Sequence, residues 1–384
     1  MVQEPLVERV ARLARERFAG RAARYDADSS FPHENYQDLH DAGLLGLTVP
    51  RAYGGLEVDA PTYALCLCEM AKGDSATALT FNMHATVASI LAALASPEQQ
   101  RRYFSGVIER GKLLASISSE PSGASFRGVY RLETVFEPVE GGYRVSGVKH
   151  FCSLADAADW YLTMGMVAGS SSAREGILTA VIRRDAPGVS VEGVWDAVGM
   201  RGTTSHSVRF DTLVPHEDVI GQPGQYLTVD ISGFALGYAA TYLGIGEAAF
   251  EYIVDYARTR TFKPSPDPLS HHPLTQREIG DMATSLRAAR LLMLEAARLK
   301  DAGDRRATML AINQAKYFSA EVGQQVTQRA LRLAGGRGIL KEMPLERWHR
   351  DSLAGPVMPP SNDRCLETIG KLVCGLEAAT LEFQ

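Results

Sequence analysis

The stretch Leu114-Ala115-Ser116-Ile117-Ser118-Ser119-Glu120-Pro121-Ser122-Gly123-Ala124-Ser125 lies where helical sequence gives way to strand-patterned sequence. It predicts a strand that runs out into a hydroxyl-rich turn. Five serines, two alanines and one glycine surround Glu120-Pro121, so no bulky side chain keeps a flat or polyanionic ligand from the backbone. This composition is typical of a binding loop, but Glu-Pro-Ser-Gly turns also end strands that bind nothing. The segment alone leaves both interpretations open.

Length and composition place the chain among globular proteins. It has 384 residues, of which 45% are hydrophobic, so two or three domains are expected. The formal net charge is -5, and no run of basic residues lacks interspersed acids, which argues against binding to nucleic acid or to a membrane surface. No stretch approaches the roughly 18 uninterrupted apolar residues of a membrane span. The expected partner is therefore a small molecule.

The cysteines and histidines predict neither a metal site nor a disulfide framework. Five cysteines lack C-x-x-C spacing, at Cys66, Cys68, Cys152, Cys365 and Cys374. An odd number of unclustered thiols suits a reducing cytosol, so we expect a cytoplasmic protein without zinc. His271-His272 lies in a proline-rich connection and is interpreted as part of a solvated linker.

The periodicity of apolar residues divides the chain into three domains. Residues 1–112 show helical spacing. In residues 113–224 apolar and polar residues alternate in short stretches that are separated by glycine-containing turns. This pattern predicts short strands in an antiparallel sheet or barrel. Residues 225–384 return to the helical period and predict a four-helix bundle. The bundle helices are expected near 227–262, 274–302, 305–334 and 361–378. The fold class is mostly α with a middle β domain.

Two helices of the first domain carry recognisable ends. One is expected to start at Pro32 and to stop at Gly43, because proline suits the first turn and glycine the C-terminal cap. The other is expected to be capped by Ser96, to have Pro97 in its first turn and to end near Gly111.

Five segments occur in the order known from one family of flavoenzymes. They are Tyr53-Gly54-Gly55; Ser119 to Ser125; Gly147 to Ser153 followed by Ala158-Asp159; Gly199 to Thr203 through Val214-Pro215; and Arg350-Asp351 after Gly335 to Gly338. With the domain order, they resemble the acyl-CoA dehydrogenase superfamily of FAD enzymes over nearly the whole chain. The resemblance implies that superfamily's fold, FAD as the cofactor and a homo-oligomer, either a dimer or a tetramer.

The resemblance also implies where the flavin lies. Ser119 would bond the edge of the ring, Phe151 would pack on the isoalloxazine, and Ser153 would contact it near N5. Ser125 would face the substrate or the flavin phosphates. These residue types suit a flavin, which needs an apolar wall for its ring and short donors for its nitrogen and carbonyl groups.

The remaining implied cofactor contacts lie in the last domain. Arg260 and Phe262 fall where the family places residues that meet the FAD of a neighbouring subunit, and Gly336 falls where backbone meets the adenosine end. Arg332 stands at a position that is commonly glutamine, and Asp363 at one that is commonly Glu or Gln. The last two either form a compensating ion pair or change the contacts to the dinucleotide.

The family's usual catalytic base is missing, so the catalytic residues stay unknown. Dehydrogenases of the family remove the proton α to a thioester with a glutamate eight residues after the Arg-Asp pair, and that position is Pro359 here. The resemblance also implies that Ser361, two residues further on, contacts the cofactor. Other members carry the glutamate directly after the arginine near the end of the first bundle helix, but Thr261 follows Arg260.

Three functions stay open. The first is α,β-desaturation of an acyl thioester, on CoA or a carrier protein, with Asp363 or Glu367 as base and an electron-transfer flavoprotein as acceptor. The second is a flavin-dependent monooxygenase or oxidase of the same superfamily, which uses reduced flavin and O2 and needs no such base. His84 would then manage a proton, although a histidine in an apolar helix is more often a core residue. The third is a non-catalytic flavin-binding subunit.

Overall fold

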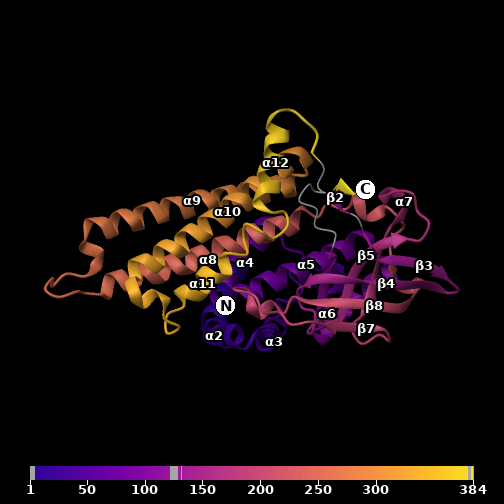
Figure 1. Ribbon diagram of the computed structural model, residues 1–384, viewed down its shortest axis with the longest axis horizontal. Coiled ribbons are helices and arrows are strands. Elements are labelled where there is room, and N and C mark those ends of the chain that lie inside the picture. Colours follow the sequence, from indigo (N-terminus) through magenta and orange to yellow (C-terminus); the bar gives the residue numbers. More distant parts are fainter. Residues whose placement is uncertain (1–4, 122–128, 131, 379–381, 384) are drawn as a thin grey trace.

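The computed structural model describes residues 5–121, 129–130, 132–378 and 382–383. The long C-terminal helices form one end of an elongated molecule and the β-sheet forms the other, with the N-terminal helices between and below them (Figure 1). This arrangement has the expected order of helical, β and helical parts.

The N-terminal third is helical, as its periodicity predicts. Its helices are α1 (Leu6–Leu13), α2 (Ala19–Asp28), α3 (His33–Asp41), α4 (Ala60–Gly73), α5 (Ser75–Leu94) and α6 (Pro97–Arg110), and a π-helical turn at Ala14–Phe18 joins the first two. Helix α6 begins with the predicted Ser96 cap, which forms a capping box with Gln99, and ends at Gly111 with a φ of 62°. Pro32 precedes the first turn of α3 instead of lying within it.

Helix α5 runs through the middle of the molecule. By length and composition it is long and apolar enough to cross a membrane, but 78% of its most apolar window is buried inside the protein. Such burial is typical of a core helix. The end of α5 leads through α6 into the sheet, so this helix connects the helical and β parts.

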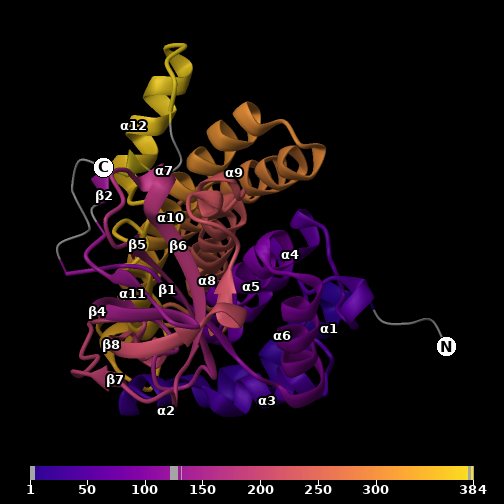
Figure 2. The same cartoon turned by 90° about the vertical axis from the view of Figure 1, so that its right-hand side faces the viewer.

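The middle of the chain forms an eight-stranded sheet (Figure 2). Its strands are β1 (Leu114–Ile117), β3 (Val135–Val139), β4 (Gly142–Cys152), β5 (Trp160–Val167), β6 (Ile177–Arg183), β7 (Val189–Glu192), β8 (His206–Pro215) and β9 (Val219–Ile220). Their order is β7-β8-β4-β3-β5-β6-β9, with β1 also paired to β5. Two short strands, β2 (Val129–Tyr130) and β10 (Glu382–Phe383), pair separately.

Most strand pairs are antiparallel, as expected, but β5 pairs in parallel with both β1 and β3. A parallel pair needs a long connection between its strands, and here that connection is the segment that contains β3 and β4 between β1 and β5. The β1 pairing places the opening stretch at the centre of the molecule, against both the sheet and α5.

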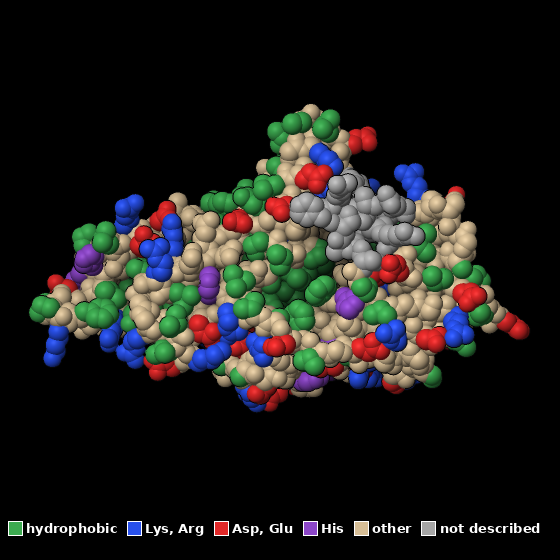
Figure 3. Space-filling model, viewed as in Figure 1, with side chains coloured by type: hydrophobic (Ala, Val, Ile, Leu, Met, Phe, Trp, Pro, Cys, Tyr) green, Lys and Arg blue, Asp and Glu red, His purple; other side chains and the backbone are tan. Residues whose placement is uncertain are grey.

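Three long helices dominate the C-terminal part, α8 (Ser232–Thr259), α9 (Pro273–Ala302) and α10 (Arg305–Ala334). The fourth expected segment is the shorter α12 (Asn362–Val373), which projects from the bundle, and α11 (Leu345–Ser352) precedes it. Helix α4 of the N-terminal part packs on α8 and α9. Below α12 this face of the molecule is hollowed, with hydrophobic side chains on the floor (Figure 3).

Short helical elements occupy several connections. They are α7 (Ala173–Gly176) and the 3-10 turns Arg51–Tyr53, Arg201–Thr203, His216–Asp218, Gln225–Thr228, Leu269–His271 and Gly335–Ile339.

Candidate active site

The opening stretch ends beside the end of β4. The Ser119 carbonyl accepts a hydrogen bond from the N–H of His150 at 2.9 Å. The next residue, Phe151, is 70% exposed, and the ring of Trp195 meets it edge-on at 6.4 Å between centroids. Ser119 and Phe151 therefore lie together, with an open aromatic ring that can serve as a wall for a flat ligand.

Glu120 has a structural role in this region. Its carboxylate lies 2.6 Å from Nζ of Lys149, and both side chains are buried. The same carboxylate accepts the N–H of Thr134 at 3.0 Å, while Lys149 also donates to the Met164 carbonyl at 2.7 Å. Burial opposes ionisation of Glu120, but the charge of Lys149 outweighs it and holds the pKa below its usual value. Glu120 is thus kept in its ionised form and is unsuited to act as a proton acceptor in catalysis.

Strained backbone conformations occur in two neighbouring segments, residues 151–154 and 200–204. Among the described residues, six non-glycine residues have a positive φ, and four of them are Phe151, Leu154, Met200 and Thr204. The two segments meet because the N–H of Leu154 donates to the Thr203 carbonyl at 3.1 Å. Such conformations persist only where the surroundings impose them, and they concentrate at functional sites.

A chain of buried hydroxyl groups runs between these segments. Ser153 Oγ lies 2.9 Å from Ser205 Oγ, which lies 2.8 Å from Thr203 Oγ1. Thr203 Oγ1 in turn lies 2.9 Å from the carbonyl oxygen of Met200. The predicted N5 contact, Ser153, is therefore the outer end of an ordered chain rather than an isolated hydroxyl.

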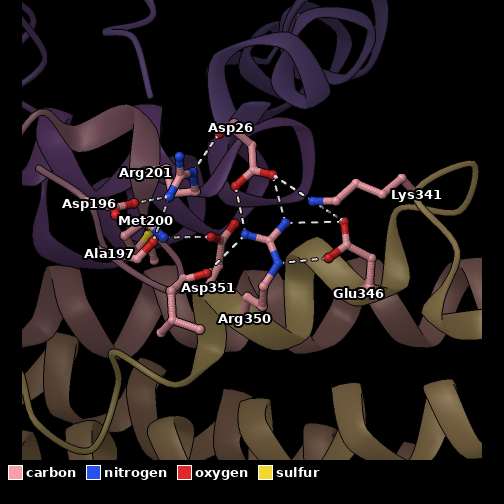
Figure 4. Close-up of polar contacts among 10 residues, drawn as sticks. Asp26, Asp196, Ala197, Met200, Arg201, Lys341, Glu346, Arg350 and Asp351 are labelled. Atoms are coloured by element: carbon pink, nitrogen blue, oxygen red, sulfur yellow. Dashed lines mark hydrogen bonds and ion pairs between the residues drawn. The ribbon is translucent and has the colours of Figure 1, made fainter. Parts of the chain in front are cut away.

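The Met200 segment is held by the Arg-Asp pair of α11 (Figure 4). The N–H of Met200 donates to the buried Asp351 carboxylate at 2.7 Å. Arg350 forms a two-pronged pair with Asp26 of α2, at 2.8 and 2.6 Å, and also bonds Glu346. Burial disfavours the Asp26 anion, but Arg350 more than compensates, so the pKa of Asp26 lies below its usual value. This junction ties α2, α11 and the strained segment together.

Glycine is required at the same junction. A Cβ at Gly199 would lie 2.1 Å from the carbonyl oxygen of Arg350 and 2.3 Å from its carbonyl carbon. Both atoms belong to the backbone of α11, so they cannot turn aside as a side chain would. The close approach brings Asp351 within reach of Met200.

His84 is a core histidine. Its Nδ1 accepts the N–H of Leu114 at 3.1 Å, so Nε2 carries the proton and faces the Leu45 carbonyl at 3.3 Å. Burial lowers the pKa of the ring to about 4. Both nitrogens are occupied, so the interpretation of His84 as a catalytic proton carrier is wrong, and the residue fixes the start of β1 against α5.

The expected cofactor contacts of the bundle lie on its surface. The guanidinium of Arg260 lies over the ring of Phe262 at 4.8 Å, and this ring is half exposed. Nε of Arg260 finds no hydrogen-bond partner among the described residues. Arg332 and Gly336 are exposed near the end of α10. Arg260 and Phe262 are thus brought together. Arg332 and Asp363 both lie in the part of the chain that the structure describes, and no ion pair within 4.0 Å joins them.

A cavity of about 180 Å³ opens between α4, α5, the start of α8 and the end of α9. Its apolar lining includes Tyr63, Ile90 and Phe234. At one side lies the ion pair of Lys300 with Asp230, at 2.6 Å. The cavity can therefore take an apolar group beside a charged rim.

Three family models match consecutive parts of the chain. The N-terminal domain of acyl-CoA dehydrogenase matches residues 2–110, its middle domain matches 115–213 and its C-terminal domain matches 229–373. The chain belongs to the acyl-CoA dehydrogenase family. Family members are flavin-dependent oxidoreductases, and FAD is their usual cofactor.

Individual members agree with this assignment. Cyclohexane-1-carbonyl-CoA dehydrogenase of Geobacter metallireducens is 31% identical over 365 residues, which is 93% of each chain. The structure of butyryl-CoA dehydrogenase from Megasphaera elsdenii superposes with a TM-score of 0.89 at 24% identity, and covers 97% of this chain and 99% of that one. TdsC from Paenibacillus sp. A11-2, solved with FMN and indole, gives 0.88 at 25% identity over 98% of both chains.

The residues at the expected positions fit FAD, the cofactor of the family. The open ring of Phe151 suits the isoalloxazine, and the hydroxyl chain ends at Ser153, a short polar group of the kind that a ring nitrogen needs. The guanidinium of Arg260, which lies over the ring of Phe262, is a group that suits a phosphate oxygen. FAD supplies the electron-accepting ring, and the protein supplies these contacts. Ser125, the other expected contact, lies outside the described residues.

The loop that carries the glutamate base in family dehydrogenases has no ionisable side chain in this member. Residues 353–361 read Leu-Ala-Gly-Pro-Val-Met-Pro-Pro-Ser, with Pro359 at the base position. Beneath the loop, the buried Lys316 donates to the Gly355 carbonyl at 2.9 Å and to Asn362 Oδ1 at 3.1 Å. Burial lowers the pKa of Lys316 to about 8. The loop is anchored, but it offers no proton acceptor.

The two acids proposed as substitutes lie on the exposed face of α12. Glu367 bonds Lys371 at 2.8 Å and Arg364 at 2.7 Å, and these bonds lower its pKa. A general base works best when its pKa is raised toward neutrality, so Glu367 is unsuited. Asp363 is exposed. Ser361 caps α12, because its Oγ accepts the N–H of Arg364 at 3.3 Å.

The sequence alone did not reveal the partners of the predicted contacts. Thr203 and Ser205 both lie within the segment from Gly199 to Pro215, but neither was expected at the site. The signal was the run of hydroxyl residues after Gly202, whose partner Ser153 lies 52 residues before Ser205. The role of Lys149 had no signal beyond its place in a motif.

Proposed function

We propose that the protein oxidises an acyl thioester, on CoA or a carrier protein, at its α,β carbon bond. The observation that carries the proposal is full-length similarity to acyl-CoA dehydrogenases, among them the Geobacter enzyme at 31% identity. Bound FAD would supply the acceptor for the hydride that leaves the β carbon. The chain's own residues hold the flavin edge and the acyl group.

The cavity supports a compact acyl group. An engineered cavity of about 150 Å³ binds benzene, so about 180 Å³ suits one ring or a short branched chain. The name of the Geobacter relative, which refers to a cyclohexane ring, agrees with this size. Phe234 and Tyr63 would then contact the apolar group.

The missing base points to an activated substrate. A positioned general base contributes about 10²–10⁴ in rate. Because residues 353–361 contain no base, the α proton would pass to water, and the α C–H must be acidic in the substrate itself. We therefore propose an acyl group that carries an aromatic ring or another electron-withdrawing substituent at the α carbon.

Anaerobic mixing with three thioesters tests this proposal. The visible band of FAD should bleach fastest with 2-phenylpropanoyl-CoA, more slowly with cyclohexane-1-carbonyl-CoA and slowest with hexanoyl-CoA. The activated and unactivated substrates should differ by about 10²-fold or more, the contribution of a general base. Bleaching by none of them, with FAD bound, would argue against thioester oxidation.

A second function is favoured by the same loop. A monooxygenase or oxidase that reacts with O2 needs no base at the α carbon, and residues 353–361 offer none. Chemically reduced enzyme should then incorporate labelled oxygen gas into an organic product. Reoxidation that yields only hydrogen peroxide and unchanged substrate would exclude the monooxygenase, and an inert, FAD-loaded protein would favour a non-catalytic flavin-binding subunit.

The protein is proposed to act as a homo-oligomer, a dimer or a tetramer, in which Arg260 and Phe262 meet the FAD of a neighbouring subunit. The half-exposed ring of Phe262, with the guanidinium of Arg260 lying over it, supports this. Sedimentation with and without FAD would test it. The electron acceptor is either an electron-transfer flavoprotein or O2. All five cysteines are free thiols, which fits the proposed cytoplasmic location.

A further inference from the structure

The hydroxyl chain behind Ser153 has a property that single residues lack. Ser153, Ser205 and Thr203 are all buried, and each link is 2.8–2.9 Å long. Each hydroxyl has one proton to donate, so the direction of each link fixes the direction of the next. A chain of three hydroxyls therefore has two proton orders in which both hydroxyl–hydroxyl bonds are kept.

In the inward order every hydroxyl donates toward Met200. Thr203 donates to the Met200 carbonyl, Ser205 donates to Thr203, and Ser153 donates to Ser205. The outer face of Ser153 then has only lone pairs and can only accept. In the outward order the two links between hydroxyl groups reverse, the bond from Thr203 to the Met200 carbonyl is lost, and Ser153 has a proton free to donate outward.

The inner end of the chain tolerates both orders. The Met200 carbonyl also accepts the Trp195 indole N–H at 3.0 Å and the Thr203 backbone N–H at 3.1 Å. It therefore keeps two donors when the Thr203 hydroxyl turns away, and no buried carbonyl is left unsatisfied. The Asp351 carboxylate holds the N–H of the same residue at 2.7 Å, so the inner end stays in place.

We propose that Ser205 and Thr203 are positioning residues that let Ser153 switch between donor and acceptor at the flavin. This inference rests on the proposed placement of Ser153 near N5. N5 of an oxidised flavin accepts a hydrogen bond, whereas N5–H of a reduced flavin donates one. The outward order suits the first state and the inward order suits the second, so the chain stabilises both.

Removing the middle hydroxyl should weaken one state more than the other. In Ser205→Ala, Ser153 still donates outward to an oxidised ring. When it accepts from a reduced ring, its own buried proton has no acceptor, which is unfavourable. The reduced form should therefore be about tenfold less populated at a given potential, which lowers the two-electron midpoint by about 30 mV.

Thr203 offers a matched pair of variants. Thr203→Val removes the hydroxyl and keeps the shape, whereas Thr203→Ser keeps the hydroxyl. The midpoint potential of bound FAD, measured by anaerobic dye titration, should fall in Thr203→Val and stay at the wild-type value in Thr203→Ser. The double variant Ser205→Ala/Thr203→Val should shift no further than Ser205→Ala alone, because both act through one chain. Ser190→Ala, an exposed serine on β7, serves as the control.

The outcomes separate the inference from its premise. If Ser153→Ala leaves the potential unchanged, the placement of the flavin beside Ser153 is wrong. If Ser153→Ala shifts the potential but Ser205→Ala and Thr203→Val do not, or if their effects add, the switching role is overturned. Loss of FAD binding in both variants and in Thr203→Ser would show a purely structural role and would also overturn it.

Discussion

Lys149→Met is expected to destabilise the protein severely, because it leaves the buried Glu120 carboxylate without its positively charged partner. The wild-type ion pair with Glu120 is 2.6 Å long, and neither side chain has appreciable exposure. Lys149 uses its three protons on Glu120 and on the carbonyls of Ser118 and Met164. Removing one partner of such a pair typically costs about 3–5 kcal/mol. That is a large share of the roughly 5–15 kcal/mol that stabilises a typical domain.

The pH dependence of the loss has a defined sign. In the wild type the pKa of Glu120 is lowered overall, because Lys149 outweighs burial, so the pair stabilises the fold above about pH 4.5 and less below it. In Lys149→Met the two contributions of Lys149 are lost, and burial, the largest effect on this group, is opposed only by the N–H bonds of Glu133 and Thr134, so the pKa of Glu120 should rise above its usual value. The folded variant then binds a proton before the unfolded chain does, so its stability should recover as the pH falls from 7 toward about 4.5.

Urea unfolding at pH 7 and pH 5 measures both effects. The double variant Lys149→Met/Glu120→Gln should lose less than Lys149→Met, since its amide oxygen still accepts the N–H of Thr134 without a charge. Arg144→Met is the matched control, because its pair with Asp211 lies on the same sheet but is exposed, and should cost under about 1 kcal/mol. A Lys149→Met loss no larger than that of the control, or one that grows as the pH falls, would refute the reasoning.

Three further variants test the junction and the core. Gly199→Ala should lower the melting temperature by several degrees, since its Cβ meets the Arg350 backbone at 2.1 Å, and an unchanged melting temperature would contradict the contact. Burial raises the pKa of Asp351 to about 6, so its carboxylate makes the fold less stable as the pH rises from about 4 to 6; Asp351→Asn should flatten that slope, and equal slopes would count against it. His84→Phe should cost about 1–3 kcal/mol by unpairing Leu114 and Leu45 while the spectrum of bound FAD stays the same; a shifted spectrum with full stability would place His84 at the flavin instead.

Local signals in the sequence were sufficient for much of the fold. The change from helical to alternating period located the sheet, and the Ser96 cap with its glycine end located α6, because both depend on neighbouring residues. The parallel pairs of β5 had no such signal, since periodicity does not say which strands pair. His84 shows the same limit, because its partner Leu114 lies 30 residues away and only the docking of β1 on α5 brings them together.

The candidate site was predictable to the extent that motifs name single residues. The motif resemblance pointed to Ser119, Phe151 and Ser153, and in the structure they lie at the end of β4, where Ser119 bonds His150. It did not point to Ser205, because that contact requires β4 and β8 to pair so that Cys152 faces His206. Long-range hydrogen bonds of this kind are fixed by strand register, which a single sequence does not reveal.

The absence of a base on the 353–361 loop and the presence of the hydroxyl chain bear on different steps. A base sets how fast a carbon loses its proton, whereas the contact at N5 sets how stable the reduced ring is. A family member that lacks the base and keeps the hydroxyl chain would still favour electron acceptance by FAD. Its substrates must then give up a proton readily, or its reaction must avoid deprotonation of carbon altogether. The anchoring of the loop by Lys316 supports this view, because the loop is held in place and the change is confined to its chemistry. Discrimination between substrates then falls to α C–H acidity and to the shape of the cavity, which is where a search for the physiological substrate should begin.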